Sequence, residues 1–385
     1  MTYYLIKTKE MNNKKISLYI MALLAVFLTA CHGTPKEMKT TSPCISVSEY
    51  AMLHEVVKIG LENVALDEEV TVDFGDGTVE TARNKAFFTH AYAQDGDYTL
   101  KAQTATGISL TADIHICRLP ALSVAMQQFK DPSYRKVWVM AHRAHTQDKS
   151  IPENSLSAIE AAVAAGAEIL ECDVRQTKDS VLVICHDETI GATTTGQGRI
   201  ADMTYEEILQ YNLKDRAGNP TDEKMPTLEA YLAAVRGRAY VDIDKCTGQG
   251  ICKKVVDVVR RTGMMEAVFF YSGVEEGTRE VLGVTEDANI YPWVGGHKLL
   301  EELPRTFFVQ TAYFTEGRSP SLGDAVEMGM IPSVCLLWVL DQTIPEYALD
   351  DKQLDELFNI FPSTRMIQTD VPAELIAALQ KKGLR

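Results

Sequence analysis

Residues 137–187 read VWVMAHRAHTQDKSIPENSLSAIEAAVAAGAEILECDVRQTKDSVLVICHD, and this stretch decides the fold. Its three short apolar runs end at polar side chains, which are His142 and Arg143, then Glu171 and Asp173, then His186 and Asp187. An apolar run of this length that stops at a charged group is typical of a buried strand. Residues 154–165 lie between the first two runs and have the Ala-rich, periodic pattern of a helix. The pattern predicts a βαβ unit with parallel strands, so we expect these side chains to converge.

Four linked motifs in this stretch carry a resemblance to a known family. They stand as His142-Arg143-Ala144, Pro152-Glu153-Asn154-Ser155, Glu171-Cys172-Asp173 and His186-Asp187. In order and spacing they resemble the glycerophosphodiester phosphodiesterase family, whose motifs are His-Arg-Gly, Pro-Glu-Asn-[Ser/Thr], Glu-x-Asp and His-Asp. The resemblance covers residues 136–385. It implies an α/β fold, a (β/α)8 TIM barrel of the phospholipase-C-like phosphodiesterase type over residues 119–385, with its site at the C-terminal ends of the strands.

The length and charge of the chain limit the alternatives. The chain has 385 residues, whereas a single barrel of this type needs about 250, which leaves room for a leader and a small module. The net charge is −15, and residues 1–30 carry four lysines and one glutamate, so the remainder carries −18. Such an acidic surface argues against a nucleic-acid partner. An anionic phosphate substrate would therefore need local positive charge, for example from a metal ion and Arg143.

Residues 1–31 predict an export signal. A basic segment, residues 11–15, precedes an apolar run over residues 16–28 that ends in Leu-Thr-Ala-Cys. This resembles a bacterial lipoprotein signal, in which Cys31 is lipidated and becomes the mature N-terminus; the alternative is an ordinary cleaved signal peptide. Residues 32–44 are polar and contain proline, as suits a tether. We therefore expect an exported protein anchored to a membrane by lipid, in the periplasm or at the cell surface.

Residues 45–118 predict a separate all-β module. Short alternating runs there are broken by Gly/Asp turns, which is typical of an immunoglobulin-like β-sandwich. Asp-Phe-Gly-Asp-Gly-Thr at residues 73–78, with a later His-Ala-Tyr, resembles a PKD-type domain. Asp73, Asp76 and His90 suit either a metal site or, by our preference, turns and corners. A glycan- or protein-binding role for this module stays open.

The barrel region offers more strands than a barrel needs. Nine apolar runs are candidate strands: residues 136–141, 168–173, 181–185, 239–244, 267–272, 288–293, 307–314, 334–340 and 366–369. An eight-stranded barrel has one place too few, and we expect 307–314 to be the run that is not part of it.

The run at residues 239–244 reads Ala-Tyr-Val-Asp-Ile-Asp and supplies a third carboxylate. Asp242 and Asp244 face the same side of a strand, where an isolated charge is costly unless it is paired or metal-bound. The family pattern here is Asn-Ile-Glu-Ile-Lys, with Glu as a metal ligand. In that alignment Asp244 takes the Glu place and Asp242 the Asn place, although Asp242 is an alternative ligand. The Lys place falls on Cys246, with Lys245 one residue early.

The resemblance implies roles for these side chains. Carboxylates of Glu171, Asp173 and Asp244 form an all-oxygen set that suits Ca²⁺ or Mg²⁺, the alternative being a salt-bridged rim without an ion. His142 and His186 suit the paired proton transfers of phosphodiester cleavage. Arg143 suits a phosphate clamp or an ion pair with Glu153 or Asp173. Further candidates for substrate contact or support are Glu153, Asp242, Lys245 and Trp338, and also His145 and Asp148 in the loop after His142.

The implied reaction is metal-dependent hydrolysis of a glycerophosphodiester to an alcohol and glycerol 3-phosphate. One alternative is a cyclising, phospholipase-like phosphodiesterase. Another is a surface lipoprotein that binds without catalysis, because the chain departs from the family at Ala144 (usually Gly), Ala192 (usually Arg) and Asp244. If the family glycine at position 144 has positive φ, we expect Ala144 to be strained.

Overall fold

The structure is a computed structural model that describes residues 42–273, 275–293, 307–312, 320–337 and 351–385. The leader, the proposed lipidation site Cys31 and the candidate Trp338 lie outside these ranges. In the described part of the chain, no helix is both long and apolar enough to cross a membrane.

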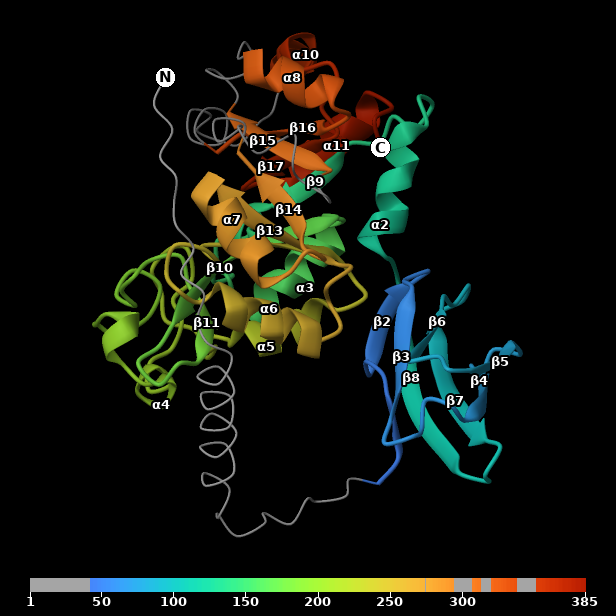
Figure 1. Cartoon of the computed structure of the whole chain (residues 1–385). Helices are drawn as coiled ribbons and strands as arrows, with labels where there is room; N and C mark the ends of the chain where they lie inside the picture. Colours follow the sequence, from blue (N-terminus) through green and yellow to red (C-terminus); the bar gives the residue numbers. More distant parts are fainter. Residues whose placement is uncertain (1–41, 274, 294–306, 313–319, 338–350) are drawn as a thin grey trace, which may run out of the picture. The chain divides into compact units, whose positions relative to one another are not determined.

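The N-terminal module is built only from strands, as predicted, and forms two sheets (Figure 1). One sheet has the order β1 (Cys44–Ser46), β3 (Val57–Glu62), β6 (Phe87–His90). The other has the order β2 (Tyr50–Leu53), β8 (Ser109–Pro120), β7 (Gly96–Thr104), β4 (Glu69–Asp73), β5 (Val79–Arg83). Alternate residues of both sheets share one apolar cluster, including Ile59, Phe88 and Leu100. Membership of the immunoglobulin-like or PKD class stays a prediction.

The acidic residues of this module stabilise a turn. Asp73 Oδ1 accepts from Gly75 N at 2.9 Å, and Asp76 Oδ1 accepts from Thr78 N at 3.0 Å. Asp76 Oδ2 lies 2.7 Å from His90 Nε2. Gly75 has φ +85°, and a Cβ there would lie 2.8 Å from a backbone oxygen of the neighbouring strand. These contacts fit the turn-and-corner interpretation of Asp73, Asp76 and His90 better than a metal site.

The C-terminal region is a parallel barrel, as predicted. Within the described residues, eight strands pair in the order β14-β13-β12-β10-β9-β17-β16-β15, and a bridge between Trp293 and Gln310 joins the two end strands. Their bounds are β9 Trp138–Ala141, β10 Ile169–Gln176, β12 Tyr240–Asp244, β13 Val268–Gly273, β14 Asn289–Pro292, β15 Phe308–Ala312, β16 Ile331–Cys335 and β17 Met366–Thr369.

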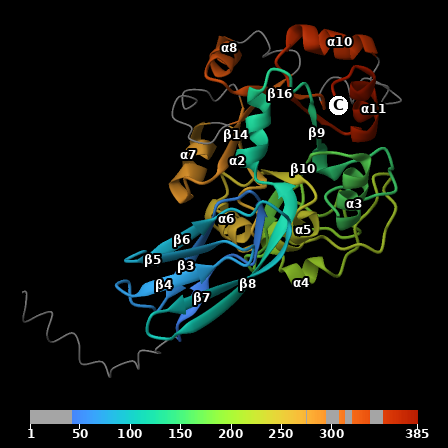
Figure 2. The same cartoon turned by 90° about the vertical axis from the view of Figure 1, so that its right-hand side faces the viewer.

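Helices cover the outside of these strands (Figure 2). They are α3 (Leu156–Ala165), α5 (Leu228–Val235), α6 (Cys252–Arg261), α7 (Glu275–Val284), α8 (Pro320–Glu327), α10 (Asp351–Ile360) and α11 (Pro372–Lys381). Short turns add α2 (Leu122–Ala125), α4 (Tyr205–Ile208) and the 3₁₀ segments η1 (Met126–Lys130), η2 (His142–Ala144) and η3 (Ile200–Asp202). The predicted helix after His142 is α3, which begins where Ser155 accepts from Ala158 N and ends at Gly166 with φ 93°.

Our choice of the surplus strand was wrong. β15 pairs with β16 along its whole length, from Phe308 with Ile331 to Ala312 with Cys335, so residues 308–312 belong to the barrel. The strand outside the barrel is β11 (Leu182–Ile184), which pairs antiparallel with the end of β10. The reason is the length of β10, whose last residues, Val174 to Gln176, extend past the barrel and form a hairpin with β11.

Two glycines of α7 give a test of this packing. A Cβ on Gly277 would lie 2.2 Å from Ser272 O of β13, whereas a Cβ on Gly283 would meet nothing within 4 Å. We expect Gly277→Ala to lower the free energy of unfolding by roughly 1–3 kcal/mol, because the helix must move off the strand. Gly283→Ala is the matched control and should raise it by about 0.5–1 kcal/mol, because alanine favours the helix. Urea unfolding measures both, and equal effects would show that α7 does not pack on β13 as described.

Candidate active site

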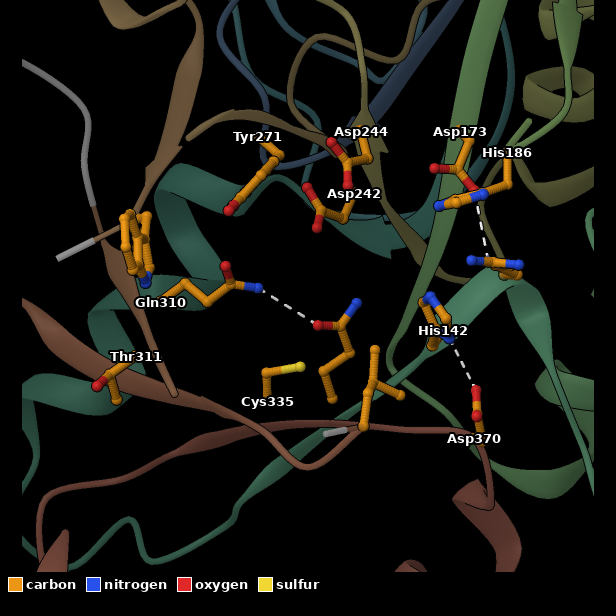
Figure 3. Close-up of a pocket in the computed structure, with 14 residues that line it drawn as sticks. His142, Asp173, His186, Asp242, Asp244, Tyr271, Gln310, Thr311, Cys335 and Asp370 are labelled. Carbon is orange, nitrogen blue, oxygen red and sulfur yellow. Dashed lines mark hydrogen bonds and ion pairs between the residues drawn. The ribbon is translucent and has the colours of Figure 1, made fainter. Parts of the chain in front are cut away.

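The predicted residues surround one cavity of about 550 Å³ at the C-terminal ends of the barrel strands (Figure 3). Its lining includes the sequence candidates His142, Arg143, Asp173, His186, Asp242 and Asp244. The convergence expected from parallel strands is therefore present, although His142, Arg143 and His186 lie just beyond strands and not on them.

His142 follows β9 directly and is held on one side by a carboxylate. Its Nδ1 lies 2.7 Å from Asp370 Oδ1, and its Nε2 lies 3.9 Å from Glu171 Oε2. Burial lowers the pKa of His142, and the hydrogen bond to Asp370 offsets only part of this effect. His142 can therefore be neutral, with Nδ1–H donating to Asp370 and Nε2 left to accept a proton.

The same oxygen of Asp370 also holds His145. His145 Nδ1 lies 2.6 Å from Asp370 Oδ1, and Nε2 lies 3.4 Å from Glu153 Oε2. Burial lowers the pKa of His145, but the hydrogen bonds to Asp370 and Glu153 outweigh it and raise the pKa overall. His145 is 7% exposed, so it supports the site from behind more readily than it contacts a substrate.

Asp370 is the main residue that our list of candidates missed. It follows Thr369, the last residue of β17, and β17 pairs directly with β9. Burial raises the pKa of Asp370, but hydrogen bonds from His142 and His145 lower it well below the usual range. The signal was available, because Asp370 is a charged residue at the end of a short apolar run, like the residues that we did select.

Arg143 lies between three carboxylates. Its backbone N donates to Glu171 Oε2 at 2.7 Å, and its Nη1 donates to Glu153 Oε1 at 3.0 Å. Its Nε lies 3.8 Å from Asp173 Oδ2 and makes no hydrogen bond within the described residues. Both ion pairs considered for Arg143 are therefore present. Burial raises the pKa of Glu153, but its contacts with His145 and Arg143 lower it overall to about 2.

The turn after β9 is strained, as the sequence suggested. Arg143 has φ 49° and Ala144 has φ 53°, both in the left-handed region that favours glycine. Ala144 is also fully buried in the barrel core. The side chain of alanine thus occupies a place where the family usually has none, at a cost of about 1–2 kcal/mol per left-handed residue.

Two neighbouring strands bring four carboxylates to one side. β10 pairs in parallel with β12, so that Glu171 lies beside Asp242 and Asp173 beside Asp244. Oxygen atoms of Glu171, Asp173 and Asp244 lie within 4.8 Å of one another. Burial, followed by the neighbouring carboxylates, raises the pKa of Glu171 well above its usual range. Crowded, buried oxygen ligands of this kind fit a hard divalent cation such as Ca²⁺ or Mg²⁺.

The geometry favours Asp244 over Asp242 as the third ligand. Asp242 is 2% exposed but does not join the oxygen atoms that gather at Glu171, Asp173 and Asp244. Its Oδ1 is buried and has no hydrogen-bond partner in the described part of the chain. Burial, with the charges of Asp244 and Asp173, raises the pKa of Asp242 well above its usual range.

Lys245 directly follows Asp244, one residue before the place at which the family has its lysine. It has φ 57°, its Nζ donates to Asp173 Oδ1, and its N donates to Asp244 Oδ1 at 2.6 Å. Cys246, which stands in the family's lysine place, is fully buried. The left-handed backbone at Lys245 thus directs an ammonium group to the carboxylates one residue early.

His186 reaches the cavity from the loop after β11. Its Nδ1 lies 2.8 Å from Asp187 Oδ1, its backbone O accepts from Arg175 Nη2 at 2.6 Å, and its side chain is 36% exposed. Figure 3 shows His186 beside Asp173 and His142 beside Asp370, and both imidazoles line the cavity. The remaining lining residues were not candidates; they include Tyr271, Trp293, Gln310 and Gln368 from the ends of β13, β14, β15 and β17.

Part of the chain is similar to known proteins. Residues 142–310 match the model of the "Glycerophosphoryl diester phosphodiesterase family". A glycerophosphodiester phosphodiesterase of Caldanaerobacter subterraneus is 33% identical over 152 residues, which is 38% of this chain and 62% of that protein. Human glycerophosphodiester phosphodiesterase 1 is 40% identical over 101 residues, 26% of this chain and 30% of that protein. The chain thus spans less than two thirds of the length of these curated relatives.

Solved structures show the same fold. A glycerophosphoryl diester phosphodiesterase of Parabacteroides distasonis has a TM-score of 0.58 and 20% identity, covering 69% of this chain and 94% of that one. An Oleispira antarctica phosphodiesterase, solved with the product sn-glycerol-3-phosphate, has a TM-score of 0.51 and 20% identity, covering 63% and 96%. At 20% identity these two structures show the fold alone, and the match to the family model covers residues 142–310.

The raised pKa values of the carboxylates predict that the free energy of unfolding depends on pH. A bound cation should remove this dependence. Burial and neighbouring carboxylates raise the pKa values of Glu171, Asp242 and Asp244, so as pH rises above about 4 the unfolded chain loses these protons before the folded protein does. The free energy of unfolding in EDTA should therefore fall as pH rises, by up to about 1.4 kcal/mol per pH unit for each titrating group. The raised pKa of His145 acts in the same direction.

Saturating Ca²⁺ or Mg²⁺ should flatten the carboxylate part of this slope, because the cation replaces the protons. Urea unfolding at several pH values, with EDTA and with each ion, measures it. Asp242→Asn is the control and should reduce the slope in EDTA, since it removes one raised carboxyl group. A slope that no ion changes would argue against a cation at these carboxylates.

Proposed function

We propose that this protein is a divalent-metal-dependent glycerophosphodiester phosphodiesterase, which hydrolyses its substrate to an alcohol and glycerol 3-phosphate. The observation that carries the proposal is the cavity at which two histidines and a three-carboxylate cluster meet, in a region that matches the family model. The names of the relatives and the glycerol 3-phosphate bound by the Oleispira antarctica phosphodiesterase support the substrate class.

The two histidines share the proton transfers in this proposal. Asp370 orients His142 and Asp187 orients His186, each through Nδ1, so each ring keeps Nε2 for the substrate. One imidazole accepts the proton of the attacking glycerol hydroxyl while the other donates a proton to the leaving alkoxide. The hydroxyl oxygen bonds to phosphorus as the alcohol leaves, which gives a cyclic phosphate. The two imidazoles then exchange roles as water opens this ring. Arg143 binds and orients the phosphate through its guanidinium group.

A Ca²⁺ or Mg²⁺ ion would be held by Glu171, Asp173 and Asp244, where it supplies positive charge to a phosphoryl oxygen. Lys245 limits the net charge of this cluster through its contact with Asp173. Glu153 holds the guanidinium of Arg143 through its contact with Nη1. These contacts would let the site bind an anionic phosphate despite the strongly acidic chain.

We also propose that Cys31 carries a lipid anchor and that the protein works outside the cytoplasm, at a membrane surface. The pattern of residues 1–31 supports this proposal. The PKD-like module would then act as a spacer or as a glycan- or protein-binding domain near that surface.

Single substitutions test the histidines. We expect His142→Ala and His186→Ala each to lower kcat by about 10²–10⁴-fold, because each removes a proton-transfer group. The assay is release of glycerol 3-phosphate from glycerophosphocholine and glycerophosphoethanolamine with Ca²⁺, Mg²⁺ or EDTA. Activity should require an ion. Accumulation of cyclic phosphate would favour the cyclising alternative, and a histidine variant with nearly full activity would remove that residue from the mechanism.

Asp370→Asn tests the orienting contact behind His142. The amide keeps the shape but loses the charge that holds both rings, so we expect kcat to fall roughly 10–10²-fold, as for carboxylates that orient other functional histidines. The KM should change little, because Asp370 lies behind the imidazole and not on the phosphate. Asp370→Glu should restore part of kcat, and an unchanged kcat in Asp370→Asn would show that the contact has no role in turnover.

A further inference from the structure

We propose that His142, His145 and Asp370 form a second metal site, which binds Zn²⁺, and that zinc bound there inhibits turnover. Each of the three side chains offers one ligand atom, and these atoms lie within 4.8 Å of one another. The site is separate from the carboxylates proposed to hold Ca²⁺ or Mg²⁺. Zinc binding is independent of the proposed function, whereas the inhibition rests on the role proposed for His142.

Both imidazoles present the same ring atom to one carboxylate oxygen. His142 Nδ1 lies 2.7 Å from Asp370 Oδ1, and His145 Nδ1 lies 2.6 Å from it. A tetrahedral zinc ion with bonds of about 2.0–2.2 Å holds its ligand atoms roughly 3.3 Å apart, so each nitrogen would move away from the oxygen by roughly 0.6 Å. Rotation of each ring about its χ2 torsion, which is soft in histidine, is enough for this shift.

The strained turn after β9 brings the two rings together. His145 N donates to His142 O at 2.8 Å, and the two residues between them have φ 49° and 53°. The ring centroids lie 5.4 Å apart, with the ring planes at 81°. Strained backbone of this kind gathers at functional sites. His145 stands outside the four motifs that carry the family resemblance, so the resemblance does not imply this ligand set.

The contacts behind His145 are those of a metal-binding histidine. A histidine that binds a metal through one ring nitrogen usually donates the N–H of its other ring nitrogen to a carboxylate. His145 Nε2 lies 3.4 Å from Glu153 Oε2, and His145 is 7% exposed. A charged His145 between two carboxylates would account for its own contacts, but a bound metal accounts for the two imidazoles together.

The ligand set distinguishes this site from the carboxylate cluster of Glu171, Asp173 and Asp244 by the metal that each prefers. Imidazole nitrogen suits Zn²⁺ and other late transition metals, whereas an all-oxygen set suits Mg²⁺ and Ca²⁺. Two nitrogen ligands and one carboxylate oxygen form a common zinc set, in which water takes the fourth position. Mg²⁺ should therefore fill the carboxylate cluster and leave the histidine site to zinc.

Zinc at this site would prevent His142 from accepting a proton. The metal takes the place of both Nδ1 protons, so that the neutral ring of His142 keeps its one proton on Nε2, and the displaced proton of His145 passes to solvent. Nε2 is the atom that the proposed mechanism leaves to the substrate, and it lies 3.9 Å from Glu171 Oε2. A ring protonated there has no lone pair for the glycerol hydroxyl, so kcat should fall.

Isothermal titration of the full chain with Zn²⁺, in saturating Mg²⁺, tests the site directly. We expect one zinc ion to bind per chain. His145→Gln should weaken this binding roughly 100-fold or more, because it removes a ligand. His115→Gln is the matched control, since it removes an exposed imidazole whose Nδ1 lies 2.7 Å from a single carboxylate oxygen, Asp97 Oδ1, and it should leave zinc binding unchanged. Equal zinc affinity in His145→Gln and the unaltered chain would overturn the site.

Cobalt(II) gives a second measurement that needs no substitution. Near-tetrahedral Co²⁺ with nitrogen ligands absorbs visible light far more strongly than octahedral Co²⁺ in an all-oxygen site, so the spectrum reports the geometry. With Mg²⁺ saturating, Co²⁺ added to the unaltered chain should give the strong absorption, and Zn²⁺ should abolish it. A spectrum of octahedral Co²⁺ alone would overturn the site.

Inhibition is measured by release of glycerol 3-phosphate from glycerophosphocholine. At saturating Mg²⁺, zinc should lower kcat roughly tenfold or more, because it blocks a proton-transfer group. His145→Gln, compared with its own zinc-free rate, should need roughly 100-fold more zinc for the same fractional loss. Inhibition that added Mg²⁺ relieves would place zinc at the carboxylate cluster and overturn the proposal, as would bound zinc with unchanged kcat. If no diester is cleaved, the proposed function fails, while the titration and the cobalt spectrum still decide the site.

Discussion

The parallel pairing of β10 with β12 is the constraint on which the site depends. Because side chains alternate along a strand, this register places Glu171, Asp173, Asp242 and Asp244 on one side of the barrel wall. Four carboxylates in a buried position repel one another and lose their hydration. The contacts around these carboxylates supply hydrogen-bond donors and positive charge that reduce this repulsion. A bound cation would reduce it further.

Several residues that surround the carboxylates have an unusual backbone conformation. Arg143, Ala144, Asn154 and Lys245 all have positive φ although none is a glycine. Asn154 Nδ2 donates to Asp173 Oδ2 at 3.1 Å, and Lys245 Nζ donates to the other oxygen of the same side chain. Strained residues of this kind persist where surrounding contacts fix them, and they gather at functional sites. The strain here serves to aim donors at Asp173 and Glu171.

His142 and His145 are similar groups whose pKa values differ because their surroundings differ. His142 and His145 contact the same oxygen of Asp370, yet the pKa of His142 is lowered and that of His145 is raised. His145 has a second hydrogen bond, to Glu153, whereas Glu171 lies 3.9 Å from His142 Nε2 and the charge of Arg143 lowers the pKa of His142. His145 is thus suited to hold a charge within the wall, and His142 to exchange a proton at the cavity.

The sequence by itself determined the kind of barrel and most of the charged residues around the cavity, because these residues stand at the ends of short apolar runs and parallel strands end at one edge. It did not identify Asp370, whose closeness to His142 depends on β17 pairing with β9 across more than 200 residues. Nor could it decide which short run lies outside the barrel. That depends on hydrogen bonds, since β11 turns back on the end of β10 while β15 pairs fully with β16. The distinct positions of Asp242 and Asp244 likewise emerged only from the tertiary structure, because period-two alternation gives both the same face and only their neighbours differ.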